Sequence, residues 1–360
     1  MYCKNIIFTD APLIKAFRYK DFFQLVPIFY STKAPISHYA SHFPCFLEYE
    51  ADVKEEDIPT EQMLRENGMS EEVLKLGRKL PSQTRARKEI LHLLSSLTNF
   101  SFYEYMGRNC WGIQTPMRDI DTLSKEEVDQ INNQFSHWTI GGYYYPSIAE
   151  DLKISSLTNC RDYYDAYDTP IDYFTINPNL ESNSEIKIPP YLSFVLDRYY
   201  SLSDEEKGTV RQCLGLLYEG IELFNTHRSV SLLSVVSSIE GMAQLDLKVF
   251  GNGEVLGAKK CFVRYLKTYV AGKSEEKFKF YYEKRCEITH EGALFLSDVD
   301  LYGDIKKQDE DWRFRLEVLQ AARIALYNWL RRKREASSRG QASAVGAAAS
   351  AAAPTAWGAE

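Results

Sequence analysis

The spacing of apolar and polar residues differs between the two halves of the chain. In the first half, aromatic and β-branched residues cluster in short runs typical of strands, at 22–30, 46–53 and 143–148. Apolar residues at helical spacing occur between these runs, at 63–80 and 85–100. The mixture predicts an α/β region, but it does not order the strands into a sheet.

Helical patterns dominate the second half. The stretch 177–192 is dense in Asn, Ser, Glu and Pro, which predicts a linker. Beyond it, Ser203 with Glu206 three residues later forms a candidate capping box. The pattern predicts a bundle of five helices, over 203–224, 228–247, 258–270, 274–289 and 309–334.

These patterns predict an α+β protein of two domains, since 360 residues exceed what one hydrophobic core usually serves. We expect a mixed α/β domain over 1–190, a candidate sensor or regulator, and an all-α bundle over 191–335. Residues 336–360 are rich in Ala, Ser and Gly, and we expect them to be a disordered tail or a remnant of cloning.

Composition narrows the classes of partner. The formal net charge is -7, so any nucleic-acid site must be a local patch. The seven cysteines are scattered without a C-x-x-C pair, as is typical of thiols in a reducing compartment. The N-terminus lacks a signal-peptide pattern, and no apolar run approaches 18 residues. We therefore expect a cytoplasmic protein without a membrane partner.

One stretch has the residue types of a zinc site. His38, His42 and Cys45 lie close together in the sequence, and histidines four apart on a helix followed by cysteine suit Zn²⁺. Pro35 and Pro44 argue against a long helix there, and a fourth ligand is missing. We expect no metal and no cofactor.

Two basic runs have simpler interpretations. The run at 78–88 is typical of a solvated loop and helix start, although it could guide RNA. The run Arg-Arg-Lys-Arg at 331–334 is most simply the C-terminal cap of a helix. The glycines at 251–257 do not have the spacing of a dinucleotide-binding loop.

Arg285 and His290 form the strongest candidate site. In a regular helix, side chains five residues apart diverge by about 140°. Gly292 can end the helix, which would leave His290 free to turn toward Arg285. An imidazole can carry a proton near neutral pH, and a guanidinium can clamp phosphate oxygens, so the pair suits cleavage of a phosphodiester.

The same spacing occurs between Arg87 and His92, which provides a control. No helix breaker follows His92 in the sequence. Its helix should therefore run on and keep the two side chains apart.

The segment around Arg285 is locally basic. Residues 258–290 hold nine lysines and arginines against four glutamates, an excess of +5. We expect Lys277, Lys279 and Lys284 to bind RNA, and Tyr281 and Tyr282 to stack on a base. A solvated cationic helix with packed tyrosines is an equally good interpretation of the sequence.

With these features, the helical region over residues 203–334 resembles the HEPN superfamily of helical nucleases and nucleotide-binding domains. The family signature is an arginine, four to six residues, and a histidine at the end of a late helix, matched here by R-C-E-I-T-H. The preceding apolar helix with Glu240 also resembles the family's second helix. The chain departs from the pattern in having Cys286 after the arginine and in placing its glycine at Gly292, one residue late.

The resemblance implies a metal-independent RNA endonuclease that works as a homodimer, with both motifs in one cleft. It also implies a toxin or an abortive-infection effector of antiviral defence, with a phage-derived trigger or an inhibitory partner protein. His290 would be the general acid or base and Arg285 would stabilise charge, supported by Glu240, Cys286 and the two tyrosines. The alternative is a non-catalytic HEPN-like module that dimerises or binds nucleotides.

Overall fold

The chain separates into two compact units, Met1–Pro190 and Tyr191–Glu360. This boundary coincides with the expected one. The computed structural model describes residues 1–28, 43–52, 68, 71–104, 113–114, 124–126, 143–144, 154–159, 173–174, 185–189, 191–300 and 303–350, without side chains at 71–79, 113–114, 143–144 and 333–350.

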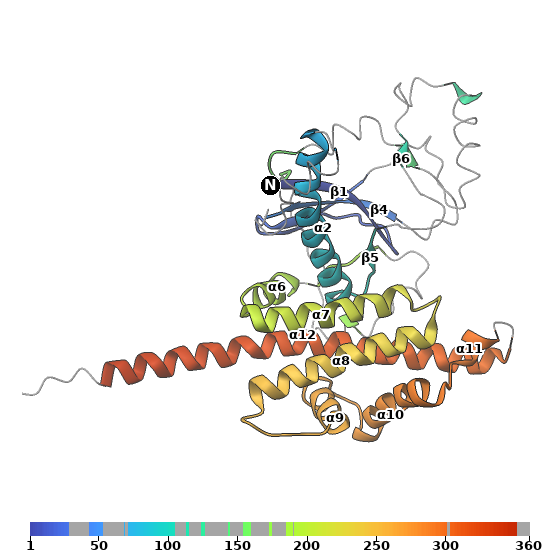
Figure 1. Cartoon of the computed structure of the whole chain (residues 1–360), viewed down its shortest axis with the longest axis vertical. Helices are drawn as coiled ribbons and strands as arrows, with labels where there is room; N and C mark the ends of the chain where they lie inside the picture. The colour runs from blue at the N-terminus through green and yellow to red at the C-terminus, as the bar shows by residue number, and fades with distance from the viewer. Residues whose placement is uncertain are drawn as a thin grey trace, which may run out of the picture. The chain divides into compact units, whose positions relative to one another are not determined.

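The N-terminal unit contains a five-stranded antiparallel sheet (Figure 1). Its order is β2-β3-β4-β1-β5, and β1 pairs with β4 over eight residues, from Tyr2 opposite Glu50 to Thr9 opposite Phe43. The strands are β1 (Tyr2–Thr9), β2 (Phe17–Tyr19), β3 (Phe23–Pro27), β4 (Phe43–Glu50) and β5 (Phe102–Tyr103).

The sheet confirms two of the expected strands, as β3 and β4. Its antiparallel pairing places the whole chain in the α+β class rather than giving this unit an α/β sheet. The third expected strand is a two-residue one, β7 (Tyr143–Tyr144), which pairs in parallel with β6 (Ile113–Gln114). The sequence pattern missed β1 and β2.

One long helix, α2 (Glu71–Leu97), lies against the sheet and buries leucines 91, 93, 94 and 97. The prediction of two helices with a loop near 78–88 is wrong, because α2 runs without interruption through Pro81. A proline inside a helix costs about 3 kcal/mol. Burial of the downstream leucines is large enough to offset that cost.

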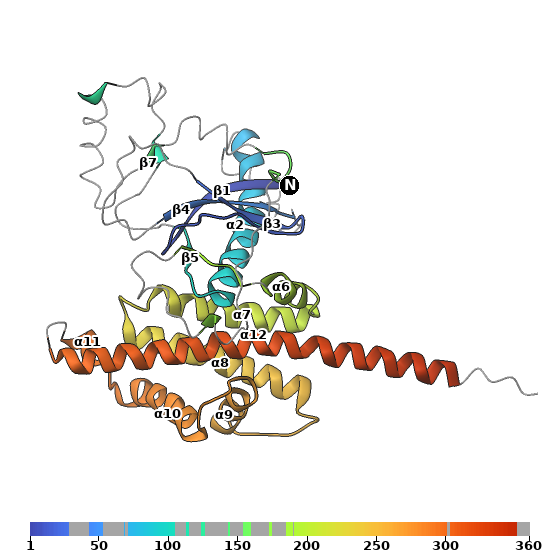
Figure 2. The same ribbon diagram turned by 180° about the vertical axis from the view of Figure 1, so that it is seen from behind.

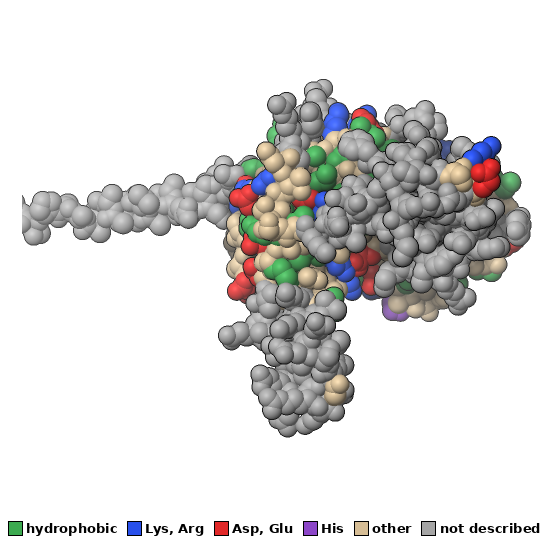
Figure 3. Space-filling model, turned by 90° about the horizontal axis from the view of Figure 1, so that it is seen from above, with side chains coloured by type: hydrophobic (Ala, Val, Ile, Leu, Met, Phe, Trp, Pro, Cys, Tyr) green, Lys and Arg blue, Asp and Glu red, His purple; other side chains and the backbone are tan. Residues whose placement is uncertain are grey.

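Charged side chains of both signs mix on the described surface in Figure 3.

The C-terminal unit is entirely helical in its described residues. It contains α6 (Leu192–Tyr200), α7 (Asp204–Glu222), α8 (Arg228–Phe250), α9 (Ala258–Tyr269), α10 (Glu275–Cys286), the π-helical turn η4 (Glu287–Glu291), α11 (Leu296–Val299) and α12 (Ile305–Ser350). All five expected helices are confirmed, and α6 and α11 are additional. The capping box at Ser203 is also confirmed, since its side chain and that of Glu206 exchange hydrogen bonds with each other's backbone.

Helix α8 forms the centre of this unit, with α7 on one side and α9 and α10 on the other (Figures 1 and 2). It is long and apolar enough to cross a membrane by length and composition, but 56% of the relevant window is buried inside the fold. A core helix of this kind passes the same test. Its burial against α7, α9, α10 and α12 accounts for its apolar sequence.

Helix α12 continues to Ser350, well past the expected end near 334. The helix therefore extends over 336–350 of the expected tail, where the many alanines have the highest helix propensity of any residue; residues 351–360 lie outside the described part. The basic run 331–334 is consequently inside a helix and is not its C-terminal cap.

Candidate active site

The helix that carries the Arg285 motif begins at a well-defined cap. The Ser274 side chain accepts a hydrogen bond from the Lys277 backbone N–H, and Glu275 and Glu276 occupy the first turn, where the helix dipole favours acidic groups. Phe278 and Tyr281 are fully buried, which fixes one face of α10 on the bundle.

The end of α10 widens into the single π-helical turn η4. In this turn the Gly292 N–H donates to the Glu287 carbonyl, five residues back, and Gly292 adopts a left-handed conformation with φ of 66°. The buried Ile288 holds the turn to the bundle. The expected helix stop at Gly292 is confirmed.

The widened turn changes the relation between Arg285 and His290. Because a π turn bonds residues five apart, it brings them closer to one face than the α-helical divergence of about 140° allows. The Thr289 hydroxyl donates to the Arg285 carbonyl at 2.9 Å, which ties the middle of the turn to the last residues of α10. His290 is exposed, and within the described residues its ring forms no hydrogen bond, so it is free to reorient.

Arg285 is held by Glu240 of α8. The Arg285 Nη2 lies 3.4 Å from Glu240 Oε2, and the two side chains are only 24% and 21% exposed. The Glu240 carboxylate, in an otherwise apolar stretch of α8, thus has a cationic partner. The Arg285 Nε is buried, with no hydrogen-bond acceptor in the described part of the chain. The guanidinium is therefore positioned, and part of its charge is neutralised.

Tyr282 belongs to the same cluster. Its ring packs edge-on against Phe262 of α9, with centroids 5.4 Å apart. Burial raises the pKa of the Tyr282 hydroxyl, and the negative charge of Glu240 is the second cause of this increase. Cys286 is half-buried with a free thiol beside this cluster. Tyr282 thus lines the Arg285 site from the α9 side.

Tyr281 does not belong to the site. It is fully buried, and its ring makes edge contacts with Phe278 and Phe314, at centroid distances of 5.9 and 5.7 Å. A ring with no exposed surface cannot stack on a base, so the role expected for Tyr281 is wrong. Residues 281 and 282 are adjacent on a helix and face about 100° apart, and only the second faces Glu240.

The three lysines expected to bind RNA are each paired with a carboxylate. The ammonium groups of Lys277, Lys279 and Lys284 lie 2.9 Å from carboxylate oxygens of, respectively, Glu317, Glu275 and Glu287. Their proposed contact with RNA remains a prediction.

The basic excess of the segment 258–290 shrinks in three dimensions. Four carboxylates from outside it form ion pairs with its cations: Glu240, Asp246, Glu254 and Glu317. Counting them with the segment's own four glutamates reduces the excess from +5 to +1. The local positive patch expected from the linear sequence is therefore weaker than the linear count indicates.

The control pair behaves as expected. Helix α2 runs on past His92, and Arg87 forms an ion pair with Glu104 and donates to the Tyr49 hydroxyl. Burial lowers the pKa of His92 to about 4, and the positive charge of Lys88 is the second cause of this decrease. A histidine that stays neutral down to that pH is a poor proton carrier near neutrality.

The zinc candidate falls mostly outside the described residues, which exclude His38 and His42. Cys45 lies fully buried in β4, where burial raises the pKa of its thiol. Among the described residues, no group of three or more His, Cys, Asp or Glu side chains could hold a metal ion.

Comparisons with protein-family models, curated proteins and solved structures found no match for this chain.

Sequence reasoning missed a second polar cluster, built from Asp246 of α8, Tyr269 of α9 and Arg332 of α12. The only local signal was the basic run at 331–334. The partners lie 23 and 63 residues apart along the chain, so no motif could have joined them.

Proposed function

We propose that the helical unit is a HEPN-type RNA endonuclease that does not require a metal ion. The observation that supports this most is an exposed, freely turning imidazole one widened turn past a guanidinium that a second helix holds in place. A mobile proton carrier beside a fixed cation suits transfer of a phosphoryl group within RNA.

In the proposed reaction, His290 takes the proton from a ribose 2′-OH, whose oxygen attacks the adjacent phosphorus. Arg285 faces the negative charge that develops on the non-bridging oxygens. The bond from phosphorus to the 5′-oxygen breaks, and this oxygen takes up a proton as it leaves. The products are a 2′,3′-cyclic phosphate and a 5′-hydroxyl.

One imidazole cannot hold both positions in this reaction, because the attacking and leaving oxygens lie on opposite sides of the phosphorus. A homodimer with a two-fold axis through the site would supply a second His290 and a second Arg285 from the same surface of the partner. Dimerisation is therefore part of the proposal. A role in antiviral defence, with the N-terminal unit as sensor, rests on the family resemblance alone.

The decisive experiment incubates the purified protein with total RNA, with and without EDTA, and maps the new ends. We expect cleavage to survive EDTA and to leave cyclic phosphate and 5′-hydroxyl ends. Loss of cleavage on chelation, restored by Mg²⁺, would contradict the mechanism. Arg285→Gln should abolish the same ends, with His92→Ala as the control.

The ion pairs favour one competing function. Glu240 occupies Arg285, and the nearby lysines are paired, as would suit a non-catalytic module that dimerises or binds nucleotides. In that case, sedimentation would detect a dimer at protein concentrations where no RNA is cleaved, and Arg285→Gln would leave it intact.

A further inference from the structure

A hollow of about 430 Å³ lies between the end of α9 and the middle of α12 and opens to solvent. Its lining is polar and cationic: Thr268, Tyr269, Asn328, Arg331 and Arg332. The hollow is shallow and open rather than enclosed, so it could take a small polar group at the surface. None of these residues belongs to the candidate active site.

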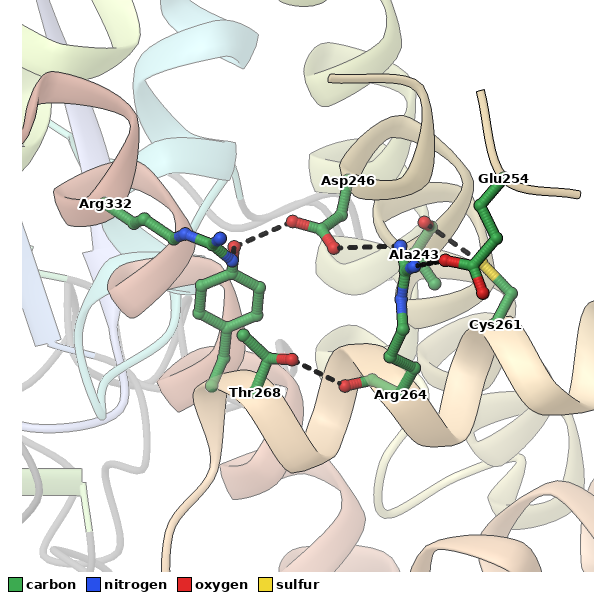
Figure 4. Close-up of polar contacts among 8 residues, drawn as sticks. Ala243, Asp246, Glu254, Cys261, Arg264, Thr268 and Arg332 are labelled. Carbon is green, nitrogen blue, oxygen red and sulfur yellow. Dashed lines mark hydrogen bonds and ion pairs between the residues drawn. The ribbon is translucent and has the colours of Figure 1, made fainter. Parts of the chain in front are cut away.

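Arg332 is fixed in this hollow by a chain of hydrogen bonds (Figure 4). Its Nη1 donates to the Tyr269 hydroxyl at 3.0 Å, and that hydroxyl donates to Asp246 Oδ1 at 2.7 Å. The Asp246 residue is only 3% exposed. The guanidinium also lies over the Phe250 ring, 4.5 Å from its centroid. These contacts offset the rotamer entropy that an exposed arginine loses when it is ordered, so the guanidinium is held in one orientation at the hollow.

The remaining polar groups around the hollow contact one another and fix its shape. The second oxygen of Asp246 lies 3.7 Å from Arg264, whose other nitrogen pairs with Glu254 at 2.6 Å. The Asn328 amide donates to the Tyr269 carbonyl at 2.8 Å, which leaves its own oxygen and one N–H available.

Arg331 is exposed at the rim of the same hollow and, among the described residues, forms no ion pair with an acidic side chain. The hollow therefore presents two guanidinium groups to solvent. That of Arg332 is held by its hydrogen bond to Tyr269, and that of Arg331 has no acidic partner among the described residues. Among the described residues, the carboxylate behind them is that of Asp246, which is buried, accepts from the Tyr269 hydroxyl through one oxygen and lies 3.7 Å from Arg264 through the other.

We propose that this hollow binds a phosphate group of a nucleotide. Two guanidinium forks match phosphate oxygens with paired hydrogen bonds, and the Asn328 amide can contact an adjoining sugar or base. The phosphate can come from a free mononucleotide or from a strand of RNA. Asp246, which holds Tyr269 at the hollow, and Glu240, which holds Arg285 at the candidate active site, are six residues apart on α8, or about 9 Å along its axis, and the two sites share no residues.

Titration calorimetry on the whole protein tests this, with inorganic phosphate, AMP and a short oligoribonucleotide as probes. We expect saturable binding that weakens at least about tenfold in Arg331→Gln/Arg332→Gln. Arg313→Gln is the matched control, because it removes a guanidinium from α12 that is 73% exposed and, among the residues that the structure describes, pairs with Asp309 alone. It should leave the affinity within about twofold.

The Tyr269→Phe variant tests whether phosphate binding depends on the positioned Arg332 or only on the positive charge of the surface. It keeps every charge and the ring but removes the hydroxyl that joins Arg332 to Asp246. We expect several-fold weaker binding in protein whose circular dichroism matches the wild type. Unchanged affinity in that variant, or an equal loss in Arg313→Gln, would overturn the proposal.

The probes also distinguish the sources of phosphate. Saturable AMP binding that the oligonucleotide does not exceed supports a mononucleotide, and tight oligonucleotide binding with no AMP saturation below about 10 mM supports an RNA strand. No saturable binding of any probe would overturn the proposal. Because His290→Ala should abolish cleavage and leave this binding intact, failure of one proposal is distinguishable from failure of the other.

Discussion

Replacing Glu240 by glutamine keeps the shape of the side chain but removes the charge that lies 3.4 Å from the Arg285 guanidinium. At that separation, with an effective dielectric constant of about 20, the bare attraction is about 5 kcal/mol. The side chains remain 21% and 24% exposed, so hydration recovers much of this when the pair breaks. A double-mutant cycle with Glu240→Gln and Arg285→Gln should therefore give a coupling free energy of about 1–2 kcal/mol, between the values for exposed and buried pairs.

Urea unfolding followed by circular dichroism would measure this coupling, with hydrogen exchange on peptides from α8 and α10 as a local readout. The control cycle is Lys279→Gln with Glu275→Gln on the same helix, where both side chains are about 40% exposed. That pair should couple by no more than about 0.5 kcal/mol. If the Glu240–Arg285 cycle gives no more than the control, Glu240 does not hold Arg285, and the positioning argument for the site is refuted.

Three further predictions concern single residues. His290→Ala should lower RNA cleavage by about 10²–10⁴-fold and His92→Ala should not, and the reverse result would mean that the wrong histidine was chosen. The N-terminal unit should lose stability in acid, because the pKa of His92 is about 4 in the fold and about 6.5 when unfolded. This contribution is fully present above about pH 6.5 and is lost as the pH falls through about 4, by up to about 3 kcal/mol; urea titrations should find it missing in His92→Gln. Gly292→Ala should destabilise by about 1 kcal/mol in thermal unfolding, since a Cβ there meets no atom within 4 Å and only the φ of 66° is strained. Gly208→Ala, equally open but within α7, should stabilise by up to about 1 kcal/mol, and shifts of the same sign would contradict this argument.

The helices of the C-terminal unit could be predicted because their ends depend on nearby residues. Ser203 and Glu206 cap α7 over three residues, and Gly292 ends η4 one residue after the turn. The Arg285–His290 motif is local for the same reason. Its π turn was not foreseeable, since nothing in the sequence separates one widened turn from a regular helix end.

The charge balance of the site could not be predicted because it depends on partners far along the chain. Glu317, in α12, pairs with Lys277 forty residues earlier, and Glu240 reaches Arg285 from another helix. A linear count assigns the positive excess correctly to the segment but omits the carboxylates that folding brings to it. The loop expected near 78–88 was wrong for a similar reason. Burial of the leucines at 91–97 outweighed the local preference of Pro81 against a helix.

The Glu240–Arg285 pair also bears on why a single subunit would be a weak nuclease. A phosphodiester and a carboxylate each carry one negative charge, so a lone phosphate gains little by displacing a carboxylate that is already partly desolvated and in place. Two things would shift that balance: a strand that brings several phosphates, or a second Arg285 across a two-fold axis that shares the same phosphate. Each adds attraction in the reacting complex without adding any to the resting subunit. By this argument, the Glu240 carboxylate competes with a single phosphate for Arg285, so Glu240→Gln should tighten RNA binding most at protein concentrations too low for dimers to form, while the proposed cleavage still requires the dimer.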